Sequence, residues 1–142
     1  MQDIEKILHN ILKSNGTSLI GSIDADGFPN IKAMLVPRKI ESGAKVFWFS
    51  TNTSSKRVAQ FQKNSNACIY FYSPRFFKGV MLTGKMEVKT DAKSKEMLWE
   101  TGDEMYYSKG VTDPDYCVLK FTANKTARYY SDFHSDDLPL NE

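Results

Sequence analysis

The sequence contains few of the residues that metal sites and disulfide frameworks need. It has two cysteines and two histidines in 142 residues, and they are not clustered. Cys68 and Cys117 each lie inside an apolar run, which is typical of buried free thiols. A structural zinc site has almost no support from this distribution. We therefore expect no metal.

Long apolar runs and an excess of one charge are also missing. No apolar run approaches the roughly 18 residues that suggest a membrane span, and the acidic start, residues 1–5, is not typical of a signal peptide. The net charge is only +2, with acids and bases interspersed, whereas a nonspecific nucleic-acid binder would show a basic stripe. Walker and Gly-x-Ser-x-Gly motifs are absent. We expect a cytoplasmic protein whose partners are neither nucleic acid nor membrane.

The pattern of hydrophobic residues predicts a mainly β protein. With 142 residues, 41% of them apolar, residues 1–142 are expected to form one domain. About six short strands joined mainly by hairpins favour a small β-barrel with helices outside it. Residues 131–142 are acidic and contain proline, so they are expected to form a tail or a partner-binding arm. The expected helices are 3–14, 55–63 and about 91–99, and the expected strands are 18–23, 31–36, 45–50, 67–72, 80–89, 116–122 and 127–130.

The most informative stretch is 47–58, Phe-Trp-Phe-Ser-Thr-Asn-Thr-Ser-Ser-Lys-Arg-Val. An aromatic strand stops at six small polar residues, and two cations and a helical spacing of apolar residues follow. Hydroxyls, free backbone N–H groups, a helix dipole and two positive charges would meet at this turn, which is what a phosphate needs. The alternative is an N-capped surface helix with two solvated cations. The stretch predicts a site for a phosphorylated small molecule.

The order of several motifs resembles one family across most of the chain, from about residue 3 to residue 130. These motifs are Lys32-Ala-Met-Leu-Val36, Phe47-Trp-Phe-Ser-Thr-Asn52, Ser55-Lys-Arg57, Val80-x-Leu-x-Gly84-x-Met-x-Val88 and Asp113-Pro-Asp-Tyr-Cys-Val-Leu-Lys-Phe121. Together they resemble the FMN-binding split barrels related to pyridoxamine 5'-phosphate oxidase, in particular the general stress protein branch. The resemblance implies a six-stranded antiparallel split β-barrel with peripheral helices. It also implies a homodimer with FMN sites at the subunit interface.

The resemblance also implies roles for particular residues. Ser55, Lys56 and Arg57 match the segment that grips the FMN phosphate. Ser50 and Thr51 match the strand end that contacts the phosphate, the ribityl chain or the flavin edge. Lys32 would place a positive charge near the cofactor, and the backbone of Ala33 and Met34 would meet the pyrimidine edge of the flavin. Trp99, Tyr106 or Lys78 would reach the cofactor from either chain.

Three functions remain open at this stage, and no catalytic residue is assigned. The first is a flavin-dependent oxidoreductase acting on an unknown small molecule, with a stress-related role. The second is a non-catalytic FMN-binding protein for flavin storage or stress sensing, and the third is a barrel for another ligand such as haem or a deazaflavin. The chain has Arg128 and His134 near its end, but their spacing and their acidic surroundings do not match the substrate clamp of the true oxidases. Oxidation of vitamin B6 is therefore not expected to be the main activity.

Overall fold

A computed structural model describes residues 3–75 and 77–140 of the chain. The last two residues of the predicted acidic tail, 141–142, lie outside the described residues. The elements in chain order are α1 (Ile4–Ser14), β1 (Thr17–Ile23), β2 (Pro29–Leu35), β3 (Lys39–Glu41), β4 (Val46–Asn52), α2 (Lys56–Lys63), β5 (Asn66–Ser73), β6 (Lys78–Lys89), α3 (Ala92–Leu98), the 3-10 helices η1 (Asp103–Met105) and η2 (Gly110–Thr112), β7 (Tyr116–Ser131) and β8 (His134–Pro139).

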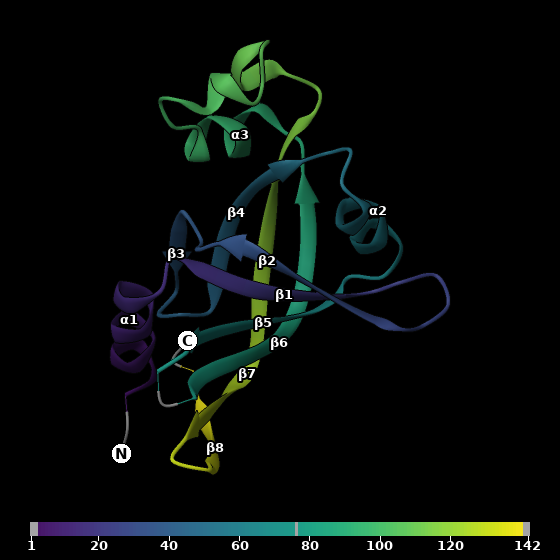
Figure 1. Cartoon of the computed structure of the whole chain (residues 1–142). Helices are drawn as coiled ribbons and strands as arrows, with labels where there is room; N and C mark the ends of the chain where they lie inside the picture. The colour runs from purple at the N-terminus through teal and green to yellow at the C-terminus, as the bar shows by residue number, and fades with distance from the viewer. Residues whose placement is uncertain (1–2, 76, 141–142) are drawn as a thin grey trace.

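The strands form one antiparallel sheet in the order β2-β1-β5-β6-β7-β4-β3, and β8 pairs with β7. Figure 1 shows the long strands β6 and β7 running along the molecule, with α1 on one side, α2 on the other and α3 at one end. The predicted mainly β fold with peripheral helices is confirmed. The described residues form eight strands rather than about six, because Lys39–Glu41 and His134–Pro139 also pair.

The two strands expected at 116–122 and 127–130 are one strand, β7, and that prediction was wrong. β6 pairs with both halves of β7, with Leu82 opposite Ala127 and Gly84 opposite Ala123. The three polar residues 124–126, which we had interpreted as a break, lie where the register shifts. At such an irregularity one strand, here β7, has more residues than its partner between two paired positions, and the strand stays continuous.

Alternating side chains of the strands fill the core. Phe47 on β4 contacts Phe71 on β5 and Phe121 on β7, with ring centroids 5.4 and 6.1 Å apart. The helix α1, capped by the Asp3 side chain, covers this core with one buried face. A second apolar cluster, formed by Trp48, Leu98, Tyr116 and Val118, joins α3 to the other face of β4 and β7.

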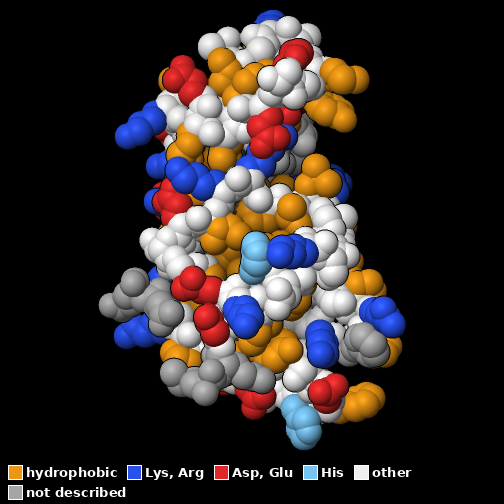
Figure 2. All heavy atoms as spheres, turned by 90° about the vertical axis from the view of Figure 1, so that its left-hand side faces the viewer, with side chains coloured by type: hydrophobic (Ala, Val, Ile, Leu, Met, Phe, Trp, Pro, Cys, Tyr) orange, Lys and Arg blue, Asp and Glu red, His pale blue; other side chains and the backbone are white. Residues whose placement is uncertain are grey.

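The described helices include none with the length and apolar character needed to cross a membrane. On the face shown in Figure 2, Lys and Arg side chains are interspersed with Asp and Glu rather than gathered into one basic strip.

Candidate functional site

The start of α2 carries a buried cation. Ser55 caps the helix, because its Oγ accepts a hydrogen bond from the Val58 N–H at 3.2 Å. Arg57 is only 9% exposed, and its Nε and Nη1 have no hydrogen-bond partner among the described residues. Burial lowers the pKa of the Arg57 guanidinium. A buried charge with unsatisfied donors is costly, so this arrangement indicates a site for an anion.

Two neighbouring pockets share Arg57 and Lys32. The smaller has a volume of about 200 Å³; it is lined by Ser22, Asn30, Ile31, Lys32, Lys56, Arg57 and Gln60. The larger has a volume of about 260 Å³; it is lined by Lys32, Ala33, Met34, Leu35, Val36, Arg38, Phe49, Ser50, Thr51, Asn52, Arg57 and Tyr107. The structure therefore brings the predicted residues of β2, β4 and α2 together around one space.

A chain of side-chain hydrogen bonds fixes the smaller pocket. Ser22 of β1 donates to Gln60 Oε1 of α2, and Gln60 Nε2 donates to Asn30 Oδ1 of β2 at 3.1 Å. Asn30 in turn donates to the Asp24 carboxylate at 3.0 Å. This bond and the Phe28 N–H lower the pKa of Asp24. The chain ties α2 to the β1–β2 hairpin, so that the cations of the two elements line the same space.

The hydroxyl of Ser50 in the larger pocket is also held in place. It lies 3.2 Å from the Tyr116 hydroxyl, which donates to the backbone carbonyl of Lys95 in α3 at 3.3 Å. Tyr116 is fully buried, and burial raises the pKa of its phenol. The end of β4 therefore presents a fixed Ser50 hydroxyl to the pocket, which Thr51 also lines. Contact of either residue with a cofactor stays a prediction.

Six residues that line the larger pocket were not predicted as site residues. Leu35, Val36, Phe49 and Asn52 lie within the motifs quoted above, whereas Arg38 and Tyr107 lie outside them. Arg38 follows β2 and makes a two-pronged ion pair with Asp103 of η1, with nitrogen–oxygen distances of 2.6 and 2.9 Å. Burial raises the pKa of Tyr107 to about 12. Neither residue belongs to a local motif, since both reach the pocket through contacts between segments distant in sequence.

Four of the predicted residues do not line these pockets, and one of them, Tyr106, is 80% exposed. Ser55 lies beside them, as the cap of α2. Trp99 contacts the pocket residue Tyr107, with ring centroids 6.2 Å apart. Lys78 begins β6 and pairs with Ser73 of β5. Their contact with a cofactor stays a prediction.

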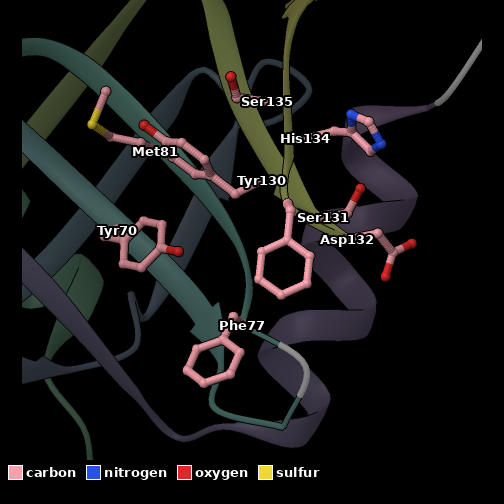
Figure 3. A pocket seen from close by; sticks show the side chains of 9 residues that line it. Tyr70, Phe77, Met81, Tyr130, Ser131, Asp132, His134 and Ser135 are labelled. Atoms are coloured by element: carbon pink, nitrogen blue, oxygen red, sulfur yellow. The ribbon is translucent and has the colours of Figure 1, made fainter.

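The largest hollow lies elsewhere, beyond the β5–β6 and β7–β8 hairpins, and has a volume of about 930 Å³. Figure 3 shows that its walls come from β5, β6 and β7, through Tyr70, Met81 and Tyr130, and from the hairpin residue Phe77. Its described lining contains no lysine or arginine but does include Asp132. It is the wrong environment for a phosphate, so size alone does not identify the site.

Comparison with solved structures gives several relatives. The protein related to general stress protein 26 from Clostridium acetobutylicum, of the pyridoxinephosphate oxidase family, is 40% identical, covers 95% of both chains and has a TM-score of 0.82. General stress protein 26 of Bacillus anthracis is 17% identical over 96% of this chain and all of that one, with a TM-score of 0.72. A pyridoxamine 5'-phosphate oxidase-related, FMN-binding protein of Nostoc punctiforme is 12% identical, covers 100% of this chain and 99% of that one, and has a TM-score of 0.68. The last two show a shared fold alone.

Among curated proteins, the pyridoxine/pyridoxamine 5'-phosphate oxidase of Legionella pneumophila is 29% identical over 76 residues, or 53% of this chain. The matched part spans only 34% of that oxidase. The family model described as pyridoxamine 5'-phosphate oxidase like matches residues 2–136. The predicted resemblance is confirmed, including its general stress protein branch, and the chain belongs to the pyridoxamine 5'-phosphate oxidase-like family.

Proposed function

We propose that this protein binds FMN in the two joined pockets and acts as a flavin-dependent oxidoreductase on a small molecule. The observation that carries the proposal is Arg57, a buried guanidinium with donors that no described residue satisfies. An FMN phosphate at the start of α2 would accept from these donors. Bound FMN supplies hydride and electron transfer, while the protein positions it and tunes its environment.

The fit of the phosphate follows from charge and geometry. Lys56 and Arg57 provide two cations at a helix N-terminus, where the dipole also favours an anion. Each charge-assisted hydrogen bond contributes roughly 1.5–3 kcal/mol. The isoalloxazine ring would then lie in the larger pocket along β2 and the end of β4, where backbone groups, hydroxyls and apolar side chains meet.

A second candidate is a non-catalytic FMN carrier or sensor. It is favoured by the lining of the larger pocket, which includes no carboxylate, imidazole or thiol among the described residues. Anaerobic mixing with NADH or NADPH separates the two candidates. Rapid bleaching of the bound flavin supports the oxidoreductase, whereas flavin that no nicotinamide donor or metabolite reduces supports the carrier.

Oxidation of pyridoxamine phosphate is not proposed as the main activity. Arg128, which would have to bind a second phosphate, is already engaged, because its Nε lies 3.0 Å from Asp137 Oδ1 across the β7–β8 pair. Asp136 lies on the same strand and adds a further negative charge. Clear turnover of pyridoxamine phosphate by flavin-loaded protein would contradict this view.

We also propose that the protein works as a homodimer with its FMN sites at the interface. The support in this chain is an exposed apolar group on the β1–β2 hairpin and β2. Phe28, Ile31 and Leu35 are 67%, 71% and 72% exposed. The group adjoins the proposed flavin pocket, since Leu35 also lines it. Apolar side chains gathered in this way are typical of interaction surfaces.

The test of FMN binding is a visible absorption spectrum of the purified protein before and after incubation with FMN and desalting. We expect a retained flavin spectrum at close to one FMN per chain. A protein that retains no flavin would contradict the proposal, and Ser55–Arg57 would then be only a capped helix or a site for another ligand.

A further inference from the structure

The helical segment 92–112, which includes α3, η1 and η2, lies at one end of the sheet (Figure 1). Tyr107 of this segment lines the larger pocket. We infer that this segment supplies a wall of the flavin-ring pocket through Tyr107, and that Asp103 is the positioning residue that holds Tyr107 there by pairing with Arg38. The inference rests on the proposed FMN site and assigns two residues to it that no local motif indicated.

Tyr107 is held on one side by aromatic rings and lines the pocket on the other. Its ring centroid lies 5.0 Å from that of Tyr116 and 6.2 Å from that of Trp99. Tyr116 is fully buried and also fixes the hydroxyl of Ser50. The Tyr107 ring therefore rests on a rigid base and is a half-buried, flat surface at the edge of the pocket. A flat surface of this kind suits contact with a flavin ring.

The backbone of Tyr107 is tied to Asp103. The Tyr107 N–H donates to the Asp103 backbone carbonyl at 3.0 Å, and the Asp103 carboxylate accepts from both terminal nitrogens of Arg38. Arg38 Nη1 also donates to the Leu98 carbonyl at 3.0 Å, and Asp103 Oδ2 accepts from the Glu100 N–H at 2.9 Å. These bonds fix the segment against the residue that follows β2. Removing the carboxylate should loosen the wall without touching the phosphate site.

The phosphate and the ring contacts respond differently to salt, which gives a readout that a general loss of structure would not imitate. A charge-charge contact weakens as salt screens it, whereas a contact between uncharged rings does not. The Tyr107 phenol is neutral at working pH, because its pKa is raised to about 12. The loss caused by removing the ring should therefore be the same at about 0.05 M and about 0.5 M NaCl, while the loss caused by removing Lys56, an exposed cation that lines the smaller pocket, should shrink.

The experiment measures FMN dissociation constants by equilibrium dialysis for folded variants at both salt concentrations. Tyr107→Ala should weaken FMN binding about tenfold at either salt. Tyr107→Phe keeps the ring and should stay within about twofold of wild type. The matched control is Tyr106→Ala, which removes an adjacent tyrosine that is 80% exposed and lines neither pocket. It should also stay within about twofold.

The positioning role of Asp103 is tested by a double-mutant cycle. Asp103→Asn should weaken FMN binding by about threefold to tenfold, and adding it to Tyr107→Ala should cause little further loss, because both changes remove the same wall. Near-additive losses would overturn the positioning role. Glu104→Gln, in the same 3-10 helix but without a contact to Arg38, is the control for Asp103→Asn.

The inference and the proposed function fail in different ways. If wild-type protein binds no FMN, both the proposed FMN site and the proposed role of Tyr107 are contradicted. If wild type binds FMN and Lys56→Met weakens its binding in a salt-dependent way, the proposed phosphate site is supported. Unchanged FMN affinity in Tyr107→Ala would then overturn the wall alone, and so would an equal loss in Tyr106→Ala.

Discussion

At the scale of one residue, Arg57 is arranged for binding an anion at the expense of the stability of the ligand-free protein. The guanidinium is buried at the start of α2, and two of its nitrogens lack partners among the described residues. Such a group destabilises the ligand-free protein by desolvation and is compensated only when an anion arrives. Its pKa is lowered by burial, and a bound phosphate would act in the opposite direction. A residue selected for folding alone would not be arranged in this way.

Replacing Arg57 by Met should therefore have two effects of opposite sign. The apolar chain fills the same space without a buried charge, so we expect the free energy of unfolding of the ligand-free protein to rise by about 1–2 kcal/mol. Loss of the charge-assisted hydrogen bonds should weaken FMN binding by roughly 1.5–3 kcal/mol. Urea unfolding and FMN dialysis measure the two effects.

Lys63→Met is the control for this pair of effects, because Lys63 lies in the last turn of the same helix and is exposed. It should change neither quantity by more than about 0.5 kcal/mol. If the ligand-free Arg57→Met protein is less stable than wild type, Arg57 has hydrogen-bond partners in solution. That result would contradict the view that its donors are left unpaired for an anion.

At the scale of elements, the contact between β6 and β7 depends on a glycine. A Cβ added at Gly84 would lie 2.1 Å from the Thr122 carbonyl oxygen and 3.0 Å from the Ala123 Cα, both of which are backbone atoms. This close approach lies beside the register shift that makes β7 continuous. Backbone atoms cannot move aside without opening the ladder.

Gly84→Ala is therefore expected to lower the free energy of unfolding by about 3 kcal/mol or more. Gly16→Ala is the matched control, because nothing lies within 4 Å of an added Cβ there, and it should change stability by less than about 1 kcal/mol. Urea unfolding of the two variants gives the comparison. Equal stabilities would mean that the sheet does not hold β6 and β7 as closely as described.

The ion pair between Arg38 and Asp103 connects the strand β2 region to the helical segment 92–112. The Arg38 hydrogen bonds are the main cause that lowers the pKa of Asp103 below its ordinary value of 3.8, against a smaller opposing effect of burial. A carboxyl with a lowered pKa in the folded state stabilises the fold above its unfolded pKa. That contribution is lost as the pH falls through the folded value.

We expect Asp103→Asn to cost about 2 kcal/mol of stability at pH 7. The difference from wild type should stay constant down to about pH 5 and shrink as the pH falls below about 4, because only the wild-type carboxylate can be protonated. Urea unfolding of both proteins from pH 7 to below about pH 4 measures this difference in stability. A difference that does not change with pH would show that the pair contributes through shape rather than charge.

At the scale of the whole molecule, features that depend on residues adjacent in sequence could be predicted, whereas features that depend on tertiary contacts could not. Ser55, Lys56 and Arg57 are adjacent, so a cap, a helix start and two cations could be identified together. Tyr107 and Arg38 reach the larger pocket only through tertiary contacts, and no spacing in the sequence indicates them.

The same distinction explains which strands were predicted. β1 and β4 have apolar patterns and were expected close to their observed bounds. The strand β8, His-Ser-Asp-Asp-Leu-Pro, has almost no apolar residues and pairs only because β7 offers it an edge. The continuity of β7 depends on a register shift against β6, which is a property of the pair rather than of either sequence.

The proposed dimer leads to a prediction for the assembly. Ile31 and Leu35 lie two positions from Ala33 on either side, so their side chains lie on one face of β2, and both are more than 70% exposed in a single chain. Burying a charge at an apolar contact is unfavourable unless it is paired. The double variant Ile31→Glu, Leu35→Glu should therefore be a folded monomer at micromolar concentration, where we expect wild type to be a dimer.

Size-exclusion chromatography with light scattering measures the mass, and circular dichroism checks the fold. Met105→Glu, which introduces the same charge at a side chain 84% exposed on η1, should leave the dimer intact. If the FMN sites lie at the interface, the monomeric variant should also lose FMN affinity. Apart from Ile31 and Leu35, every residue that lines the two pockets is unchanged in this variant. A monomer that binds FMN as tightly as wild type would show that one chain holds the whole flavin site, and a double variant that stays dimeric would place the interface on another face.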